Sequence, residues 1–347
     1  MKVAFVVQRY GAGVDGGSEA HCRAIAERLA PEMELEVWTS TARDYLTWAN
    51  ELPEGISVEN GVRVRRFPVA SRRRVRSFGR LSERLYRTPH SLEDEIDWMQ
   101  RQGPRVPALL EALRAERDRF DAFVFYTYLY YPTAFGLPLV CEKSVLVPTL
   151  HDEPPAQFGI FHPIFHLPRA LIWNTPEERD TAVRLFRIAP DGEISGVGIE
   201  PIDAPRDAFR ARRGLGDYLL FLGRIDVFKG VPELLDHFAR YRRERGGVSL
   251  VLAGKSYMNV PRADGVHVVG FLDEKEKREA LAGALATVAP SSFESLSIVT
   301  LESWAAGTPV LATARSEVVA AQCRRSRGGL IYGSYDDFRD AVDQLRG

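Results

Sequence analysis

The sequence contains few cysteines and only short apolar runs. Its three cysteines, Cys22, Cys141 and Cys323, lie far apart among 347 residues, so they form no metal-type cluster and, being odd in number, no complete disulfide framework. This usage predicts a reduced, cytoplasmic setting. No apolar run reaches the roughly 18 residues that span a bilayer. The apolar run after Lys2 ends at once in Gln-Arg, so we expect a buried first strand there instead of a signal segment.

An excess of charge of either sign is also absent. The formal net charge is −1, which gives no general attraction to nucleic acid or to membranes, and we expect no nucleic-acid partner. The hydrophobic content of 45% is ordinary for a soluble protein with a full core. At this length, two domains are the natural expectation.

Short β-rich runs alternate with amphipathic helical patterns along the whole chain. This order predicts βαβ units and parallel sheets, with strands near 35–40 and 62–67 and helices over 18–30 and 232–245 for example. Two prolines and several acids interrupt the pattern at 198–207. We therefore expect two Rossmann-like, doubly wound α/β domains, residues 1–197 and 198–347, that face each other across a cleft.

A glycine-rich turn follows the first expected strand. Gly11, Gly13, Gly16 and Gly17 lead into Ser18 and a helix. Such a turn at a helix N-terminus lets backbone N–H groups approach a phosphate or a sugar closely. A turn that only caps the helix explains the same residues, and both interpretations stay open.

Two cations follow the first strand of the second domain, in FLGRIDVFKG. Arg224 ends the strand, and Lys229 comes just before the next helix. Together they could neutralise a diphosphate, Arg as a fork and Lys as a point charge. Surface cations paired with neighbours such as Asp226 are the alternative.

Two glutamates, Glu294 and Glu302, stand eight positions apart in SSFESLSIVTLESWAAGTPVLAT. Eight residues of helix would rise about 12 Å, comparable to a nucleotide diphosphate from ribose to sugar. Carboxylates accept hydrogen bonds from vicinal hydroxyls, and Ser295 and Ser297 could present backbone donors to a phosphate. Otherwise Glu302 is an ordinary helix residue and Glu294 a negative charge at a helix N-terminus.

Residues 71–87 hold seven arginines and one acid, Glu83. Apolar residues recur there at helical steps, so a helix would be apolar on one side and cationic on the other. Its apolar side could pack on the domain. Alternatively, the segment could contact anionic lipid head groups, which would place the protein on the inner face of the cell membrane, or a phosphorylated acceptor.

Taken together, the glycine turn, the Arg224–Lys229 pair, the strands that end in AGK and VGFL, and Glu-x7-Glu before AAGTPVLAT resemble the retaining family-4 glycosyltransferases with the GT-B fold. The resemblance runs from VVQRYGAGVDGGSEAH to GGLIYG. It departs at the end, because similar proteins usually continue with a further helix or two, whereas this sequence stops at Gly347. A compact variant or a shortened chain would explain that.

The resemblance implies a role for each matching residue. Arg224 and Lys229 would bind the diphosphate of a UDP-, GDP- or ADP-sugar, and Glu294 would contact the donor sugar. Glu302 would hold the ribose. Further donor contacts would come from Gly254, Lys255, Phe271, Ser295, Leu296 and Ser297. In the first domain, Gly16, Gly17 and Ser18 would lie against phosphates or acceptor, and His151 would face the sugar.

His151 also fits a plain structural interpretation, as a hydrogen-bonded residue at the end of a strand. Asp152 and Glu153 beside it could hint at a metal, but the chain has no Asp-x-Asp triplet. We therefore expect no metal and no cofactor, with the cations supplying the charge neutralisation.

The expected reaction is transfer of a sugar, with retained configuration, to a hydroxyl acceptor that could be a glycan, a lipid-linked or a small molecule, as in polysaccharide or glycolipid biosynthesis. A sugar-nucleotide epimerase on the same scaffold and a non-catalytic nucleotide-sugar-binding partner remain as alternatives.

Overall fold

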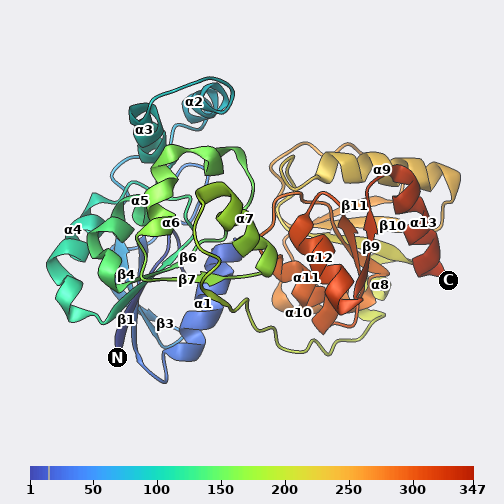
Figure 1. Ribbon diagram of the computed structural model, residues 1–347. Helices are drawn as coiled ribbons and strands as arrows, with labels where there is room; N and C mark the ends of the chain where they lie inside the picture. Colours follow the sequence, from blue (N-terminus) through green and yellow to red (C-terminus); the bar gives the residue numbers. More distant parts are fainter. Residues whose placement is uncertain (15) are drawn as a thin grey trace. The chain divides into compact units, whose positions relative to one another are not determined.

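The computed structural model describes residues 1–14 and 16–347. By its internal contacts the chain divides into two compact units, Met1–Val197 and Gly198–Gly347 (Figure 1). Each unit has its own sheet with helices on both faces.

The first unit is built on an eight-stranded sheet in the described part of the chain. The strand order is β3-β4-β2-β1-β5-β6-β7-β8, so β1 lies in the middle and the order reverses between β1 and β5. The strands are β1 (Lys2–Val6), β2 (Glu34–Ser40), β3 (Gly55–Glu59), β4 (Val62–Phe67), β5 (Ala122–Tyr126), β6 (Ser144–Val147), β7 (Ala170–Trp173) and β8 (Glu193–Ile194).

Helices cover both faces of this sheet. The helices of the first unit are α1 (Gly17–Leu29), α2 (Val75–Arg87), α3 (Leu92–Gln102), α4 (Pro107–Glu116), α5 (Tyr131–Gly136), α6 (His162–His166) and α7 (Pro176–Phe186). Short 3₁₀ helices lie at Arg117–Arg119, Leu137–Lys143, Pro154–Gln157 and Gly159–Phe161.

Alternation along the central strand explains why two helical layers are needed. In β1, Val3 and Phe5 belong to one buried apolar cluster, whereas Ala4 and Val6 belong to another. Neighbouring side chains of a strand point to opposite faces, so both faces must be covered. A fully buried side chain of this size contributes about 1.5–3 kcal/mol.

One strand was not expected from the sequence. β3 pairs antiparallel with β4, with Ser57 opposite Val64, at the edge of an otherwise parallel sheet. Its side chains are mostly exposed, including Ile56 and Val58. The strands expected from the sequence, 35–40 and 62–67, leave this one out, because an edge strand needs only backbone pairing and leaves little hydrophobic periodicity to read.

The arginine-rich segment forms α2, which projects with α3 from the first unit (Figure 1). The apolar side of α2 is used internally: Leu85 is buried, and Phe78 stacks near Trp98 of α3 with ring centroids 5.5 Å apart. Arg73, just before α2, donates to the Gln102 side chain. The remaining arginines of 71–87 are exposed. Packing on the domain thus accounts for the apolar stripe, and a cationic surface remains.

The second unit has a six-stranded, fully parallel sheet in the order β11-β10-β9-β12-β13-β14. Its strands are β9 (Tyr218–Leu222), β10 (Ser249–Ala253), β11 (Val266–Gly270), β12 (Ala286–Ala289), β13 (Val310–Thr313) and β14 (Gly329–Tyr332). Its helices are α8 (Ala208–Arg213), α9 (Val231–Glu244), α10 (Glu274–Gly283), α11 (Ile298–Ala305), α12 (Glu317–Ser326) and α13 (Tyr335–Arg346). The prediction of two doubly wound α/β units is confirmed.

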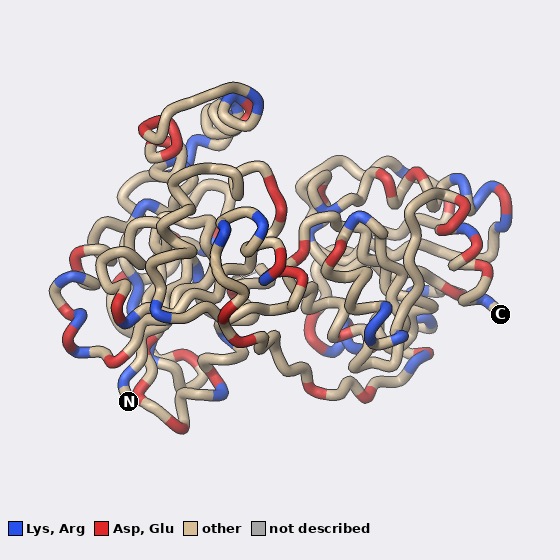
Figure 2. The backbone as a smooth tube through the Cα atoms, viewed as in Figure 1, with Lys and Arg blue, Asp and Glu red and all other residues tan. Residues whose placement is uncertain are grey.

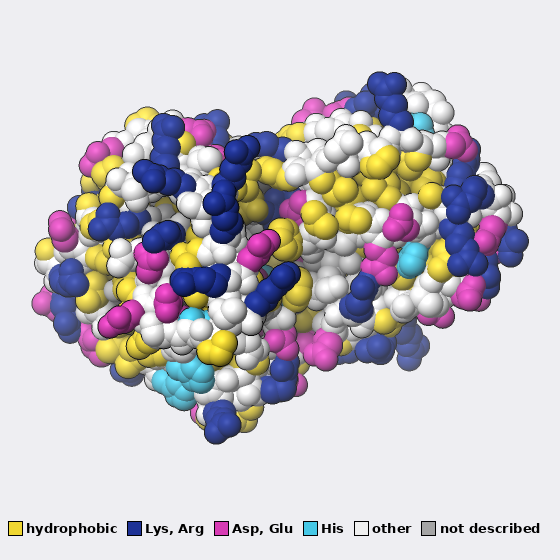
Figure 3. All heavy atoms as spheres, turned by 90° about the horizontal axis from the view of Figure 1, so that it is seen from above, with side chains coloured by type: hydrophobic (Ala, Val, Ile, Leu, Met, Phe, Trp, Pro, Cys, Tyr) yellow, Lys and Arg dark blue, Asp and Glu magenta, His cyan; other side chains and the backbone are white. Residues whose placement is uncertain are grey.

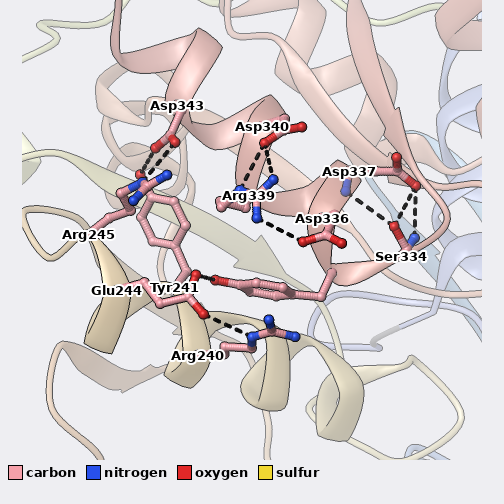
Figure 4. Close-up of polar contacts among 11 residues, drawn as sticks. Arg240, Tyr241, Glu244, Arg245, Ser334, Asp336, Asp337, Arg339, Asp340 and Asp343 are labelled. Carbon is pink, nitrogen blue, oxygen red and sulfur yellow. Dashed lines mark hydrogen bonds and ion pairs between the residues drawn. The ribbon is translucent and has the colours of Figure 1, made fainter.

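Polar contacts attach α13 to α9 on one face of the second sheet (Figure 4). Tyr335 donates its hydroxyl to Glu244 at 2.6 Å, and Arg245 pairs with Asp343 at 3.1 Å. Ser334 caps α13 by accepting from the Asp337 N–H. Together with the buried Phe338, these contacts fix the last helix of the chain onto the sheet.

Charged residues of both signs are interspersed along the tube of both units (Figure 2), in keeping with the net charge of −1. Within residues 1–14 and 16–347, the structure has no helix long and apolar enough to pass through a bilayer.

Candidate functional site

The site in the second unit lies where its strand order reverses. β9 and β12 are neighbours in the sheet, but the chain winds outward in opposite directions from them. Open α/β sheets bind ligands at the carboxyl ends of such strands, because the loops that follow diverge and leave room between them. The two loops here are residues 223–230 after β9 and 290–297 after β12.

Asp226 folds the first of these loops. Its carboxylate accepts the Lys229 N–H at 2.8 Å and lies 3.6 Å from Nε of Arg224. The Asp226 side chain is only 9% exposed. The pairing of Arg224 with Asp226 named in the plain interpretation is therefore present, but the Lys229 ammonium points elsewhere.

Gly230 brings the two loops into contact. Its φ of +72° is disfavoured for other residues. A Cβ atom there would lie 2.3 Å from the Pro290 carbonyl oxygen. Only glycine fits, and this close approach carries Lys229 across to the loop after β12.

Lys229 and Glu294 form the centre of the site. The Lys229 Nζ lies 2.7 Å from Oε1 of Glu294, and the two side chains are 29% and 17% exposed. A pair at this depth keeps some contact with solvent but loses part of its hydration. A charged, hydroxylated ligand can therefore replace the contact between the two side chains with contacts of its own. The structure thus brings together two residues that lie 65 positions apart in the sequence.

Glu302 lies one helix away. It sits on α11, and its Oε1 accepts from Nζ of Lys277 of α10 at 2.8 Å. Burial alone would lower the pKa of Lys277, but the carboxylates of Glu302 and Glu274 outweigh it and raise that pKa, so the lysine stays charged. Glu294 precedes α11 and is not helical. The expectation that a continuous helix separates the two glutamates is therefore wrong.

The start of α11 is shaped by a strained serine. Ser297 is the N-cap residue with φ +61° and makes no capping side-chain hydrogen bond; its hydroxyl lies 2.9 Å from that of Thr300 instead. Ser295 and Leu296, which precede it, are buried. A helix N-terminus without a side-chain cap leaves backbone N–H groups for an anion. Positive φ at a non-glycine residue is often found at functional sites.

The strands on the other side of β9 end in the remaining predicted donor residues. Gly254 follows β10, and its N–H donates to the Gly270 carbonyl of β11 at 2.7 Å. Lys255 accepts from the Ile225 N–H, which ties it to the loop after β9. Phe271 follows β11, and 71% of its surface is exposed. Parallel strands end at one edge, so these residues share that edge with Lys229.

In the first unit, the glycine turn is supported by a buried ion pair. Arg9 contacts Oε1 of Glu19 through Nε at 2.9 Å and through a terminal nitrogen at 2.6 Å, with side chains 8% and 5% exposed. Ser18 donates to the other oxygen of Glu19 and accepts from Gln8. A Cβ at Gly16 would lie 2.1 Å from Glu19. Gly16 and Ser18 therefore form a fixed loop, with Gly17 open beside them.

The turn has the letter spacing of a dinucleotide fingerprint, from Gly11 through Gly13 to Gly16. That fingerprint also needs an acid at the end of the second strand. The acid about 20 residues on is Glu36, which lies inside β2 and pairs with Lys2 and Arg63. A dinucleotide site is therefore not supported here.

His151 follows β6 and is held by an acid. Its Nδ1 lies 3.1 Å from Oε1 of Glu153, and the same oxygen accepts from the buried Tyr128 hydroxyl at 3.0 Å. Asp152 pairs with Arg184 instead. This arrangement leaves Nε2 as the ring nitrogen that Glu153 does not contact, and the role expected of His151 stays a prediction.

A buried carboxylate holds the segment that precedes His151. Glu178 of α7 accepts the Leu150 N–H and the Asn174 N–H, each at 2.6 Å. Burial raises the pKa of Glu178 to about 7, although these hydrogen bonds and His151 act in the opposite direction. Glu178 therefore joins the ends of β6 and β7.

Sequence reasoning missed Lys277 and Glu178, and it named Asp226 only as a possible ion-pair partner. All three act through other residues, and no spacing connects Lys277 with Glu302. Among the described residues, no group of three or more His, Cys, Asp and Glu side chains could hold a metal ion.

The chain resembles known proteins in sequence. Residues 216–346 match the family model described as glycosyl transferases group 1. The chain is also 28% identical over 374 residues to the D-inositol 3-phosphate glycosyltransferase of Nocardiopsis dassonvillei, a match that covers 94% of this chain and 80% of the relative.

Solved structures share the fold. Sucrose-phosphate synthase from Thermosynechococcus elongatus superposes with a TM-score of 0.71 at 18% identity, covering 99% of this chain and 89% of that one. HepE from Anabaena, solved with UDP-glucose, gives a TM-score of 0.69 at 13% identity, covering 100% and 90%. At these identities the likeness shows the fold alone, and it confirms the expected fold class of GT-B type.

Proposed function

We propose that this chain, whose residues 216–346 match the model of group 1 glycosyl transferases, transfers a sugar from a nucleotide-diphosphate sugar to a hydroxyl acceptor with retained anomeric configuration. It belongs, in this proposal, to the family-4 branch suggested by its motifs. The observation that carries the proposal is the 2.7 Å pair of Lys229 and Glu294 at the point where the strand order of the second sheet reverses.

The donor occupies the carboxyl edge of that sheet. Arg224 and Lys229 bind its diphosphate, and the free N-terminus of α11 at Ser297 adds backbone donors. Glu294 accepts from sugar hydroxyls. At the other end, Glu302, held by Lys277, accepts from the ribose hydroxyls.

The base lies over the ends of β10 and β11. The backbone at Gly254–Lys255 forms one side of this pocket, and Phe271 offers an exposed aromatic face for stacking. A neighbour solved with UDP-glucose favours a uridine nucleotide.

In the reaction, the bond between the anomeric carbon and the diphosphate oxygen breaks, and a bond from that carbon to the acceptor oxygen forms on the same face. The acceptor hydroxyl proton passes to the departing diphosphate oxygen. Arg224 and Lys229 stabilise the negative charge that develops on the leaving group, the task that a metal ion performs elsewhere. The proposal therefore needs no metal.

The test is binding and transfer with matched variants. UDP-, GDP- and ADP-glucose are added to the intact chain, and the correct donor raises its melting temperature because it binds only the folded state. Glu302→Ala is expected to abolish that shift, whereas Glu317→Ala, at the start of α12, leaves it intact. A donor shift undiminished in Glu302→Ala would remove Glu302 from the site.

Stereochemistry and reaction class need a separate measurement. Proton NMR of the first turnovers with a donor of known anomeric configuration reports retention or inversion. Isomerised donor in the absence of acceptor would favour an epimerase. Donor binding without transfer to any acceptor would favour a non-catalytic partner protein.

The acceptor is a hydroxylated molecule. The Nocardiopsis relative, a D-inositol 3-phosphate glycosyltransferase, favours a phosphorylated cyclitol over a polysaccharide. Gly16, Gly17 and Ser18 are the residues of the first unit that we assign to it, because their loop is fixed by Arg9 and Glu19 and exposes backbone donors at the start of α1.

The exposed arginines of 71–87 carry a second, peripheral proposal, contact with an anionic membrane. Lys and Arg side chains are frequent in the view from above, the side from which α2 projects (Figure 3). Val75 and Tyr86 of this helix are also exposed. Sedimentation with vesicles should show binding to anionic but not to neutral lipid, reduced by the double substitution Arg76→Glu and Arg80→Glu. Equal sedimentation with both vesicles would contradict it.

A further inference from the structure

A second pocket, of about 410 Å³, lies wholly within the first unit. This is the size of small-molecule sites. Its lining comes from the loop after β1, from α1, from the loop after β2 and from the β3–β4 hairpin: Tyr10, Gly11, Ala12, Arg23, Glu27, Arg43, Leu52, Val58, Glu59, Asn60 and Arg66.

The acidic groups of this pocket are already engaged. Glu59 pairs with Arg66, whose side chain is only 4% exposed. Glu27 accepts from the Asn60 side chain at 2.9 Å and lies 4.0 Å from Arg23. Neither carboxylate therefore offers its full accepting capacity to a ligand.

Donors, in contrast, are in excess. The Arg43 side chain makes no hydrogen bond or ion pair with residues 1–14 or 16–347, and it is exposed. The hydroxyl of the buried Tyr10 and Nε of Arg66 also lack a hydrogen-bond partner in the described part of the chain. Buried polar atoms are seldom left unpaired unless a water, an ion or a ligand satisfies them.

The Tyr10 hydroxyl belongs electrostatically to this pocket. Burial raises its pKa most, and Glu27 and Glu59 raise it further while Arg23 lowers it. The hydroxyl therefore stays protonated and can only donate to an anion. Besides the buried Cys22, the groups that act on the pKa of Tyr10 are charged residues of the cavity lining.

We propose that this pocket binds the anionic group, phosphate or carboxylate, of a small hydroxylated molecule. Arg43 takes the anion as a bidentate fork, and the buried Tyr10 hydroxyl and Arg66 Nε are the unpaired donors of the same lining. Leu52 and the exposed Val58 cover the carbon skeleton of the ligand.

The pocket is coupled to the glycine turn. Arg9, which holds Glu19 beside Gly16, also donates to the Arg43 carbonyl at 2.8 Å. On this connection we assign the bound molecule as the acceptor, an assignment that rests on the proposed glycosyl transfer, whereas anion binding itself does not.

Calorimetry with the full chain tests the binding. Glucose 6-phosphate and glucuronate serve as anionic probes, and glucose is the neutral control. We expect at least one anion to bind at least ~10-fold more tightly than glucose, and Arg43→Ala to weaken it by ~10-fold or more. Tyr10→Phe, which removes only an unpaired hydroxyl, should weaken it less without loss of stability. Arg63→Ala, an exposed arginine of β4 paired with Glu36, should change nothing.

Equal binding of glucose and both anions, or unchanged binding in Arg43→Ala, overturns the site. UDP binding is measured on the same samples. If UDP binds and the anions do not, this pocket is wrong and the proposed function stands. If the anions bind through Arg43 but no donor or acceptor combination gives transfer, the pocket stands and the proposed function falls.

Discussion

Arg9 and Glu19 in the first unit, and Lys229 and Glu294 in the second, are cation–carboxylate pairs beside the central strands of two doubly wound sheets. They differ in depth and in connection. The first pair joins a loop to the helix that follows it and is almost fully buried. The second bridges two loops from neighbouring strands, and its lysine remains 29% exposed.

This difference separates support from function. A buried pair without solvent holds backbone in place, and removing one partner leaves an uncompensated charge. A partly exposed pair costs less to open, so a ligand can take the place of one partner. We therefore assign the first pair to holding the glycine turn and the second to binding the donor.

The largest effect is expected on activity in the second unit. Lys229→Ala removes a cation that faces the leaving group, so kcat/KM for transfer should fall ~10²–10³-fold, while the unfolding free energy changes by less than ~1 kcal/mol. Steady-state kinetics and urea unfolding give the two numbers. Lys275→Ala, an exposed lysine of α10, is the matched control. Near-normal kcat/KM in Lys229→Ala would show that the two pairs do not differ in the way we describe.

The mirror result is expected on stability in the first unit. Glu19→Ala leaves the buried Arg9 charge without its partner and should lower the unfolding free energy by ~3–5 kcal/mol. Urea unfolding measures the loss. Replacing both partners, as Arg9→Met with Glu19→Leu, should recover much of it. A loss under ~1 kcal/mol would mean that this pair is as dispensable structurally as the one in the second unit.

A third measurement uses pH to isolate a buried carboxylate of the first unit. The pKa of Glu178 is raised by burial to about 7, above its ordinary value. The folded state then holds the proton more tightly, so this contribution to stability is complete at low pH. It is lost as pH rises from about 4.5 to about 7, by roughly 3 kcal/mol.

Unfolding of wild type and Glu178→Gln across pH 4.5 to 7.5 tests this. The variant is less stable, because a side-chain amide has one oxygen and cannot accept from both the Leu150 and the Asn174 N–H. Its stability should not fall over this pH range as that of the wild type does. Parallel pH curves for the two proteins would refute the assignment.

The smallest effect concerns Glu302. Lys277→Ala leaves the ribose-binding carboxylate in place but removes the ammonium 2.8 Å away that orients it. Donor affinity should fall ~3–10-fold, about 1 kcal/mol, with kcat little changed. Calorimetric titration with the donor checks this. A loss as large as that of Glu302→Ala would assign Lys277 itself to the donor.

Much of the fold and part of the site followed from sequence. Strands such as 62–67 and helices such as 18–30 were placed within one residue of their observed ends, because apolar periodicity is a local property. β3 was missed because it lies at an edge. Polar residues at strand ends do not contribute to the hydrophobic core, and this is why the sequence pointed to Arg224, Lys229, Glu294 and Glu302.

What the sequence determined by itself is the order of elements and the chemical types at the strand ends. Only the tertiary structure decided which of them meet: that Lys229 reaches Glu294, that Glu302 turns to Lys277, and that three arginines from separate elements line one pocket. These pairings depend on strand order and on close approaches such as that of Gly230 to Pro290. Contacts between residues far apart in the chain leave no local pattern from which they can be predicted.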